Sequence, residues 1–188
     1  MNVPNAITLS RLLVTALTFV FLEVAWAPTA PHAAWAWWAF ALFLVAAGTD
    51  FLDGYLARKW QMVTAFGRVA DPFADKVLIA GTLVMLLQFD RATEVLPHWY
   101  VVVVIAREFL VTAVRGVVEA AGRPFPADRL GKYKMVAQCV TAAALLTLVA
   151  GSTALHWVAV AGLWISLVLT IVSGVNYVWK ARDVLFGR

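Results

Sequence analysis

The sequence predicts an all-α polytopic membrane protein, with six transmembrane helices in one bundle and both termini in the cytoplasm. Three observations lead to this fold class: the hydrophobic composition, six long apolar runs, and an asymmetric distribution of Lys and Arg. Of 188 residues, 63% are hydrophobic and 14% are charged, and the mean hydropathy is +0.82. Soluble domains do not have this composition. Because little polar sequence remains for a second unit, we expect residues 1–188 to form a single membrane domain.

Six apolar segments are long enough to cross a bilayer as helices. They lie at about 12–31, 33–51, 73–89, 98–118, 133–150 and 155–179. Asp71 and Pro72 suit the cap and first residue of the third helix, since the first turn does not use the amide hydrogen that proline lacks.

The distribution of Lys and Arg sets the orientation of these helices. In a six-span arrangement, only Arg91 falls on one side, and the other side carries Arg11, Arg58, Lys59, Arg68, Arg123, Arg129, Lys132, Lys134, Lys180, Arg182 and Arg188. The positive-inside rule places this second side in the cytoplasm. All three histidines (His32, His98 and His156) fall in the outer connections, so histidine chemistry is not expected at a cytoplasmic site. The net charge of +4 is explained by topology and anionic lipid, and no nucleic acid partner is expected.

Four aspartates stand between the second and third apolar segments. Asp50 and Asp53 are three apart, and Asp71 and Asp75 are four apart, so each pair shares one face of a helix. A hairpin through a loop at Gly67 would bring the pairs face to face. Four such carboxylates repel one another unless cations intervene, and an all-oxygen set favours Mg²⁺ or Mn²⁺. Two such ions about 3.5–4 Å apart would clamp a diphosphate.

The residues around the aspartates fit the same chemistry. Gly54, Ala57 and Gly67 are small enough for a substrate to approach the backbone closely, and Arg58 offers a planar fork to a phosphate. The alternative is that the aspartates are helix caps and loop charges paired with Arg58, Lys59 and Arg68. That alternative explains single aspartates better than it explains all four together.

The pattern Asp-x2-Asp-Gly-x2-Ala-Arg-x8-Gly-x3-Asp-x3-Asp over residues 50–75 resembles the signature of the CDP-alcohol phosphotransferase family at every defined position. The resemblance implies a six-helix homodimer in a bacterial plasma (inner) membrane, with the active site facing the cytoplasm. It implies transfer of a phosphatidyl-type group from a CDP-linked lipid to an alcohol, with release of CMP. The implied ligands of two divalent metals per active site (Mg²⁺ or Mn²⁺) are Asp50, Asp53, Asp71 and Asp75, with Asp75 also the catalytic base. The implied CDP-binding residues are Gly54, Ala57, Arg58 and Gly67.

Cations near the cytoplasmic side suggest an acceptor that is itself an anion. The fourth segment contains Arg107, Glu108 and Arg115, and the fifth begins with Arg129, Lys132 and Lys134. We expect Arg107, Arg115, Lys132 and Lys134 to bind an acceptor phosphate. Two alternatives remain open: the charges within the segment pair only with one another, and the lysines attract anionic lipid head groups.

Two further stretches are similar to the branch of the family that makes phosphatidylglycerophosphate. One is the opening from Asn2 to Arg11, and the other combines Arg107-Glu108 with Gly131-Lys132-Tyr133-Lys134 and Gln138. Met135 departs from the threonine expected in that branch. The branch implies CDP-diacylglycerol as donor and sn-glycerol 3-phosphate as acceptor. Asn5 and Thr8 are expected to frame the CDP, although helix capping explains both equally well.

Other acceptors remain as alternatives within the same chemistry: phosphatidylglycerol (in cardiolipin synthesis), inositol phosphate or serine. Outside enzymes, the alternative is a small cation-binding transporter. Transporters usually have broken helices or two matching halves, and neither is evident in this sequence. Apart from its substrates, membrane lipid and a second copy are the expected partners.

Overall fold

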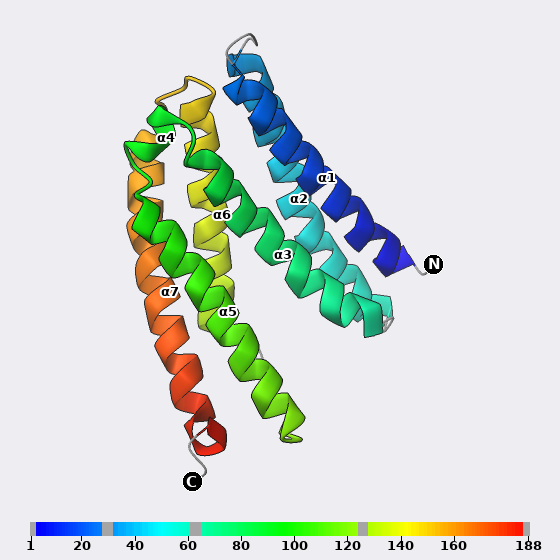
Figure 1. The fold of residues 1–188 in the computed structure, drawn as a ribbon. Coiled ribbons are helices and arrows are strands. Elements are labelled where there is room, and N and C mark those ends of the chain that lie inside the picture. The colour runs from blue at the N-terminus through cyan, green and yellow to red at the C-terminus, as the bar shows by residue number, and fades with distance from the viewer. Residues whose placement is uncertain (1–2, 28–31, 61–64, 124–127, 186–188) are drawn as a thin grey trace.

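The computed structural model describes residues 3–27, 32–60, 65–123 and 128–185, and the side chains of residues 3–5, 32, 50–60, 65, 66, 68 and 69 lie outside this description. These parts of the chain are helical and contain no strand (Figure 1). The elements are α1 (Val3–Trp26), α2 (His32–Trp60), α3 (Ala65–Leu86), α4 (Asp90–Thr93), α5 (His98–Ala120), α6 (Arg129–Val149) and α7 (His156–Leu185).

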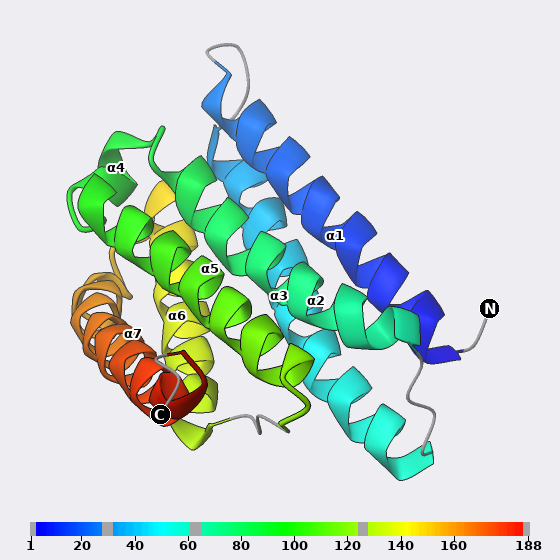
Figure 2. The same cartoon turned by 60° about the horizontal axis from the view of Figure 1, so that its bottom comes forward.

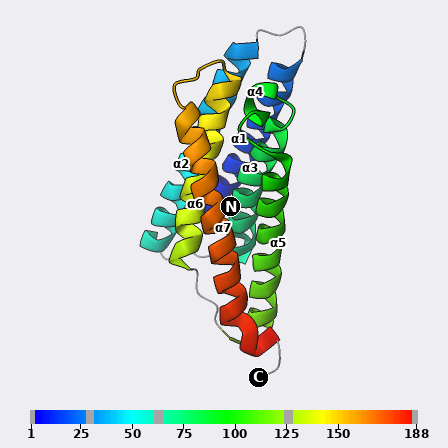
Figure 3. The same ribbon diagram turned by 90° about the vertical axis from the view of Figure 1, so that its left-hand side faces the viewer.

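The six long helices lie side by side, and each runs opposite to the long helix before it (Figures 1 and 3). Their contacts close a ring in the order α1–α2–α6–α7–α5–α3, with α3 also contacting α6 across the bundle. In Figure 2, α3 and α5 lie next to each other, with α1 and α2 on one side and α6 and α7 on the other. The first half of the chain therefore meets the second where α3 contacts α5 and α6 and where α2 contacts α6.

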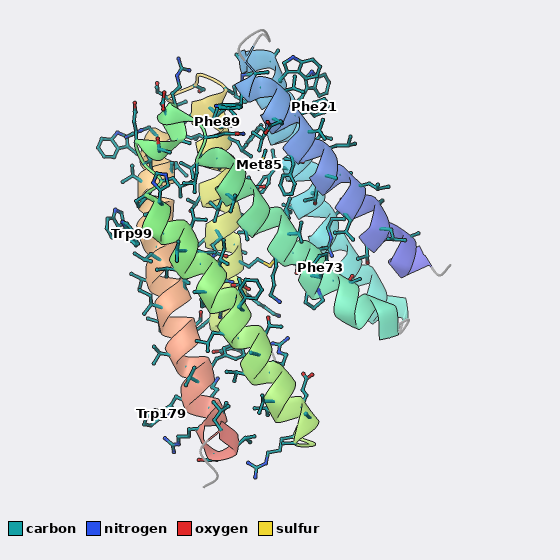
Figure 4. All side chains as sticks on the ribbon, viewed as in Figure 1. Phe21, Phe73, Met85, Phe89, Trp99 and Trp179 are labelled. Atoms are coloured by element: carbon teal, nitrogen blue, oxygen red, sulfur yellow. The ribbon has the colours of Figure 1, made fainter. Side chains whose placement is uncertain are left out.

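Three described helices are long and apolar enough to cross a membrane by length and composition: Ala6–Trp26, Arg129–Val149 and His156–Leu185. Ala33–Thr49 is a shorter apolar helix. The bundle also has large apolar side chains on its outside, and Trp99 and Trp179 project outward in Figure 4. Helices that are apolar on their outer as well as their inner faces are typical of membrane proteins.

The buried interior contains an apolar core and a set of buried polar side chains. The apolar core lies toward α4 and draws Leu22, Phe43, Leu83, Tyr100 and Leu145 from five of the helices. The buried polar side chains include Thr8, Arg11, Arg107, Lys134, Gln138, Thr170 and Ser173. Thr8, Arg11 and Lys134 lie in the halves of their helices away from α4, whereas other buried hydroxyls, such as those of Thr82 and Thr147, lie nearer to it.

The predicted start of the third helix is wrong. α3 begins at Ala65, so Gly67 is helical and Asp71 and Pro72 lie inside the helix instead of at its cap. Proline suits a first turn, but a helix also accepts it further in at the loss of one backbone hydrogen bond. Residues 65–70 extend the helix before Pro72, and the Asp71 side chain accepts a hydrogen bond from another helix instead of capping its own.

Candidate active site

Two carboxylates on α3 meet two polar side chains of α1, and we call this group the acidic site (Thr8, Arg11, Asp71 and Asp75). Thr8 Oγ1 donates a hydrogen bond of 2.6 Å to Asp71 Oδ1. Arg11 Nη1 lies 3.0 Å from Asp75 Oδ1, and Arg11 Nη2 lies 3.7 Å from Asp71 Oδ1. Residues three and four apart lie on the same face of a helix, so α1 and α3 each present one polar face to the other.

The acidic site has a buried cation and partly exposed anions. The Arg11 side chain is fully buried, whereas the side chains of Asp71 and Asp75 are 49% and 28% exposed. A buried guanidinium is costly unless carboxylates pair with it. Arg11 therefore fixes the position of both carboxylates while leaving them accessible.

The donor chemistry of Asp71 and Asp75 suits a hard divalent cation, because both carboxylate side chains are partly exposed on one helix face, although Asp75 Oδ1 is buried. Asp50 and Asp53 lie on α2, but their side chains lie outside the described residues. Among the described side chains, no three of His, Cys, Asp or Glu are grouped to hold a metal. The four-aspartate metal set thus stays a prediction, and its α3 half has suitable ligands.

The structure gives the helix on which each predicted CDP-binding residue lies, but it does not describe all of their side chains. Gly54, Ala57 and Arg58 lie on α2, and Asn5 lies on α1, but their side chains lie outside the described residues. Gly67 lies on α3, one turn before Asp71.

The histidines lie away from the carboxylates of the acidic site, as expected, but each is the first residue of a helix and does not lie in a connection. His98 and His156 begin α5 and α7, at the end of the bundle opposite to the start of α3 (Figure 1).

A second charged group, the basic cluster (Arg107, Glu108 and Lys134), joins α5 and α6. Arg107 Nη1 lies 3.2 Å from Glu108 Oε1, and Lys134 Nζ pairs with the same oxygen. Glu108 also interacts electrostatically with Lys76, which follows Asp75 on α3. The cluster brings together two of the four predicted acceptor-binding cations, and Glu108 pairs with a cation of another helix as well as with one of its own segment.

The other two predicted acceptor-binding cations have different surroundings. Arg115 Nη2 donates a hydrogen bond of 3.0 Å to Tyr177 Oη on α7. Lys132 is exposed on the first turn of α6. Arg115 is thus held beside the basic cluster by α7, and Lys132 lies at the surface.

The sequence interpretation missed Glu108 as the shared counter-ion, Arg11 as the partner of the α3 carboxylates, and Ser173 and Tyr177 on α7. The three-residue spacing of Thr8 and Arg11 was a usable signal for a polar face on α1. Contacts between helices distant in sequence leave no such spacing.

Comparison with known proteins agrees with the resemblance seen at residues 50–75. Residues 1–172 match the family described as CDP-alcohol phosphatidyltransferase. Three similar proteins are named CDP-diacylglycerol–glycerol-3-phosphate 3-phosphatidyltransferase. The protein of Bacillus subtilis (strain 168) is 38% identical over 199 residues, covering 98% of this chain and 97% of the relative.

Two relatives from other bacteria give a similar result. The protein of Rickettsia typhi (strain ATCC VR-144 / Wilmington) is 33% identical over 188 residues, covering 98% of this chain and 99% of the relative. The protein of Shigella flexneri serotype 5b (strain 8401) is 35% identical over 195 residues, covering 100% and 98%. The chain therefore belongs to the CDP-alcohol phosphatidyltransferase family and is an enzyme of this class.

Proposed function

We propose that this enzyme transfers the phosphatidyl group of CDP-diacylglycerol to sn-glycerol 3-phosphate, giving phosphatidylglycerophosphate and CMP. The observation that carries the proposal is the full-length identity of 33–38% to proteins named for this reaction. The grouping of accessible carboxylates at one site and of cations at another supports it, because the reaction needs both a diphosphate site and a site for an anionic acceptor.

For the membrane arrangement, we propose a single domain of six spans with both termini in the cytoplasm. The enzyme would lie in a bacterial plasma membrane as a homodimer, with its active site open to the cytoplasm. The alternating directions of the six long helices support this arrangement, as does the concentration of Lys and Arg on one side.

On the donor side, the proposed ligands of two divalent cations (Mg²⁺ or Mn²⁺) are Asp50, Asp53, Asp71 and Asp75. When bound, such cations neutralise the diphosphate and favour the departure of CMP. Thr8 and Arg11 hold the α3 carboxylates in place through the contacts at 2.6 and 3.0 Å. The proposed contacts to CDP are Asn5, Thr8, Gly54, Ala57, Arg58 and Gly67.

In the proposed reaction, the acceptor hydroxyl oxygen attacks the phosphorus that bears the diacylglycerol. The new P–O bond forms as the P–O bond to CMP breaks, and Asp75 takes the proton of the hydroxyl. No covalent intermediate with the enzyme is needed.

On the acceptor side, the proposed phosphate-binding residues are Arg107, Arg115, Lys132 and Lys134. The Nε groups of Arg107 and Arg115 are buried, and neither has a hydrogen-bond acceptor among the described residues. Because buried donors are normally paired, these two groups are suited to the oxygens of a bound phosphate.

The test is a panel of acceptors with detergent-purified protein, CDP-diacylglycerol and Mg²⁺. Glycerol 3-phosphate, phosphatidylglycerol, inositol phosphate and serine are supplied separately, and CMP release and the mass of the lipid product are measured. We expect phosphatidylglycerophosphate with glycerol 3-phosphate and no product with the other three. Turnover only with another acceptor would contradict the assigned acceptor. Failure to release CMP with any acceptor, with Mn²⁺ also supplied to folded protein, would contradict the reaction.

A further inference from the structure

Three residues of α7 contact the two arginines of α5, and they lie just beyond residue 172, where the family match ends. We propose that Ser173, Gly174 and Tyr177 form a cradle (the α7 cradle) that positions Arg107 and Arg115 to bind the acceptor phosphate. Tyr177 is its central positioning residue. This inference rests on the proposed function, since it assigns a role in acceptor binding.

Tyr177 contacts both arginines. Its buried hydroxyl accepts a hydrogen bond of 3.0 Å from Arg115 Nη2. The guanidinium carbons of Arg107 and Arg115 lie 5.7 and 6.0 Å from the centre of its ring, within the range of cation–π attraction. The two arginines are eight residues apart on α5, which is about 12 Å along the axis. One side chain of α7 thus contacts both arginines, although they are two turns apart on α5.

Ser173 and Gly174 fix Arg107 at its head and its stem. Arg107 Nη2 donates a hydrogen bond of 2.9 Å to Ser173 Oγ. A Cβ atom at residue 174 would lie 3.3 Å from Arg107 Cγ, so the glycine leaves the room that the arginine stem needs.

The same part of α7 holds the start of α6, which carries Lys132 and Lys134. The backbone N–H of Asp128 donates a hydrogen bond of 3.2 Å to Tyr177 Oη. The Asp128 carboxylate accepts a hydrogen bond from Asn176 Nδ2 and lies 3.5 Å from Lys180 Nζ. α7 therefore sets the α5 arginines and the beginning of α6 relative to each other.

The contacts of the α7 cradle differ from ordinary helix packing because one hydrogen-bond donor of each arginine has no acceptor among the described residues. Tyr177 and Ser173 engage the terminal nitrogens of the arginines, whereas the buried Nε groups have no acceptor among the described residues. Two guanidiniums that border the same side chain lower the energy of an anion bound between them. Releasing either arginine should therefore weaken acceptor binding more than donor binding.

The test compares two tyrosine-to-phenylalanine variants of the full-length enzyme. Tyr177→Phe keeps the ring and removes the hydroxyl that Arg115 uses, so we expect the KM for glycerol 3-phosphate to rise about tenfold. The KM for CDP-diacylglycerol should stay unchanged. The matched control is Tyr100→Phe, which removes a buried hydrogen bond of 2.7 Å to Ser166 at the same α5–α7 interface and should change neither KM.

Thermal unfolding in detergent shows whether Tyr177→Phe is folded. If it is not, a second pair of variants tests the same proposal. Gly174→Ala crowds Arg107 Cγ and should raise the KM for glycerol 3-phosphate. Gly162→Ala, also on α7, places a Cβ 2.7 Å from Thr141 Oγ1. It should lower stability without changing either KM.

The outcomes separate this inference from the proposed function. Equal KM effects in Tyr177→Phe and Tyr100→Phe, or an equal rise in both KM values, would overturn the α7 cradle while wild-type turnover still supports the function. If the wild type uses a different acceptor, the same comparison is made with that acceptor, and an acceptor-specific rise in KM supports the cradle. Absence of turnover with every acceptor would overturn both.

Discussion

The acidic site and the basic cluster are built from opposite proportions of charge. In the acidic site, two carboxylates from α3 face one buried guanidinium from α1. In the basic cluster, a guanidinium from α5 and an ammonium from α6 share one carboxylate. Each group contains a single charge of the minority sign, which lets the majority charges approach one another. The net charge is negative in the acidic site and positive in the basic cluster. The acidic site is therefore suited to cations, and the basic cluster is suited to an anion.

The two groups also differ in where their residues come from. The acidic site joins α1 and α3, which lie in the first half of the chain. The basic cluster and the α7 cradle join α5, α6 and α7, and their contacts between helices link residues 26 to 66 positions apart. We expect the single opposite charge of each group, Arg11 or Glu108, to stabilise the structure. The carboxylates of the acidic site and the cations of the basic cluster should serve the reaction. Mutations can test this division.

The largest expected effect is the loss of turnover when one carboxylate of the acidic site is neutralised. Asp75→Asn removes the proposed base, so turnover should fall by about 10²–10⁴-fold, while CDP binding is retained. CMP release and calorimetric CDP binding measure the two quantities. Asp183→Asn on α7 is the control, since Asp183 is exposed and, among the described residues, pairs with its neighbour Arg182 at 3.5 Å. A wild-type rate in Asp75→Asn would remove Asp75 from the base role.

The next largest effect is a loss of stability when the carboxylate of the basic cluster is neutralised. Glu108→Gln leaves Arg107 and Lys134 without their shared carboxylate, so the free energy of unfolding should fall by about 3–5 kcal/mol. Unfolding in detergent by a denaturant series measures this change. Adding Lys134→Met should restore part of the loss, because the buried ammonium is then absent as well. If Glu108→Gln is as stable as the wild type, Glu108 is not the counter-ion that holds the cluster together.

The smallest effect is on the hydrogen bond that orients Asp71. Thr8→Val removes a single hydroxyl at nearly constant shape, and the loss of about 1 kcal/mol corresponds to roughly a fivefold fall in turnover. Thr18→Val is the matched control, because that buried hydroxyl on α1 donates to the carbonyl oxygen of Val14 on its own helix at 2.9 Å. Equal rates in the two variants would show that Thr8 does not orient the carboxylate.

The sequence predicted the parts of this molecule that leave a local pattern. Hydropathy indicated the six long helices, and the spacing of Asp71 and Asp75 indicated their shared face. The start of α3 was wrong because Pro72 satisfies both a first turn and a helix interior, and only packing against α1 decides between them. Tyr177 was missed because a tyrosine in an apolar helix usually fills the core. Its contacts to Arg115 and Asp128 depend on which helices become neighbours.

The ring order of the helices has a consequence for how such enzymes diversify. The helices up to α3 supply the acidic site, the helices from α5 onward supply the basic cluster and the α7 cradle, and the short α4 (Asp90–Thr93) joins these halves. If the first half handles the nucleotide and the second half the acceptor, a chimaera joined at α4 would exchange the acceptor and retain the donor. If the donor and acceptor specificities are inherited separately in this way, new phospholipid head groups could arise without any change to the proposed catalytic aspartates.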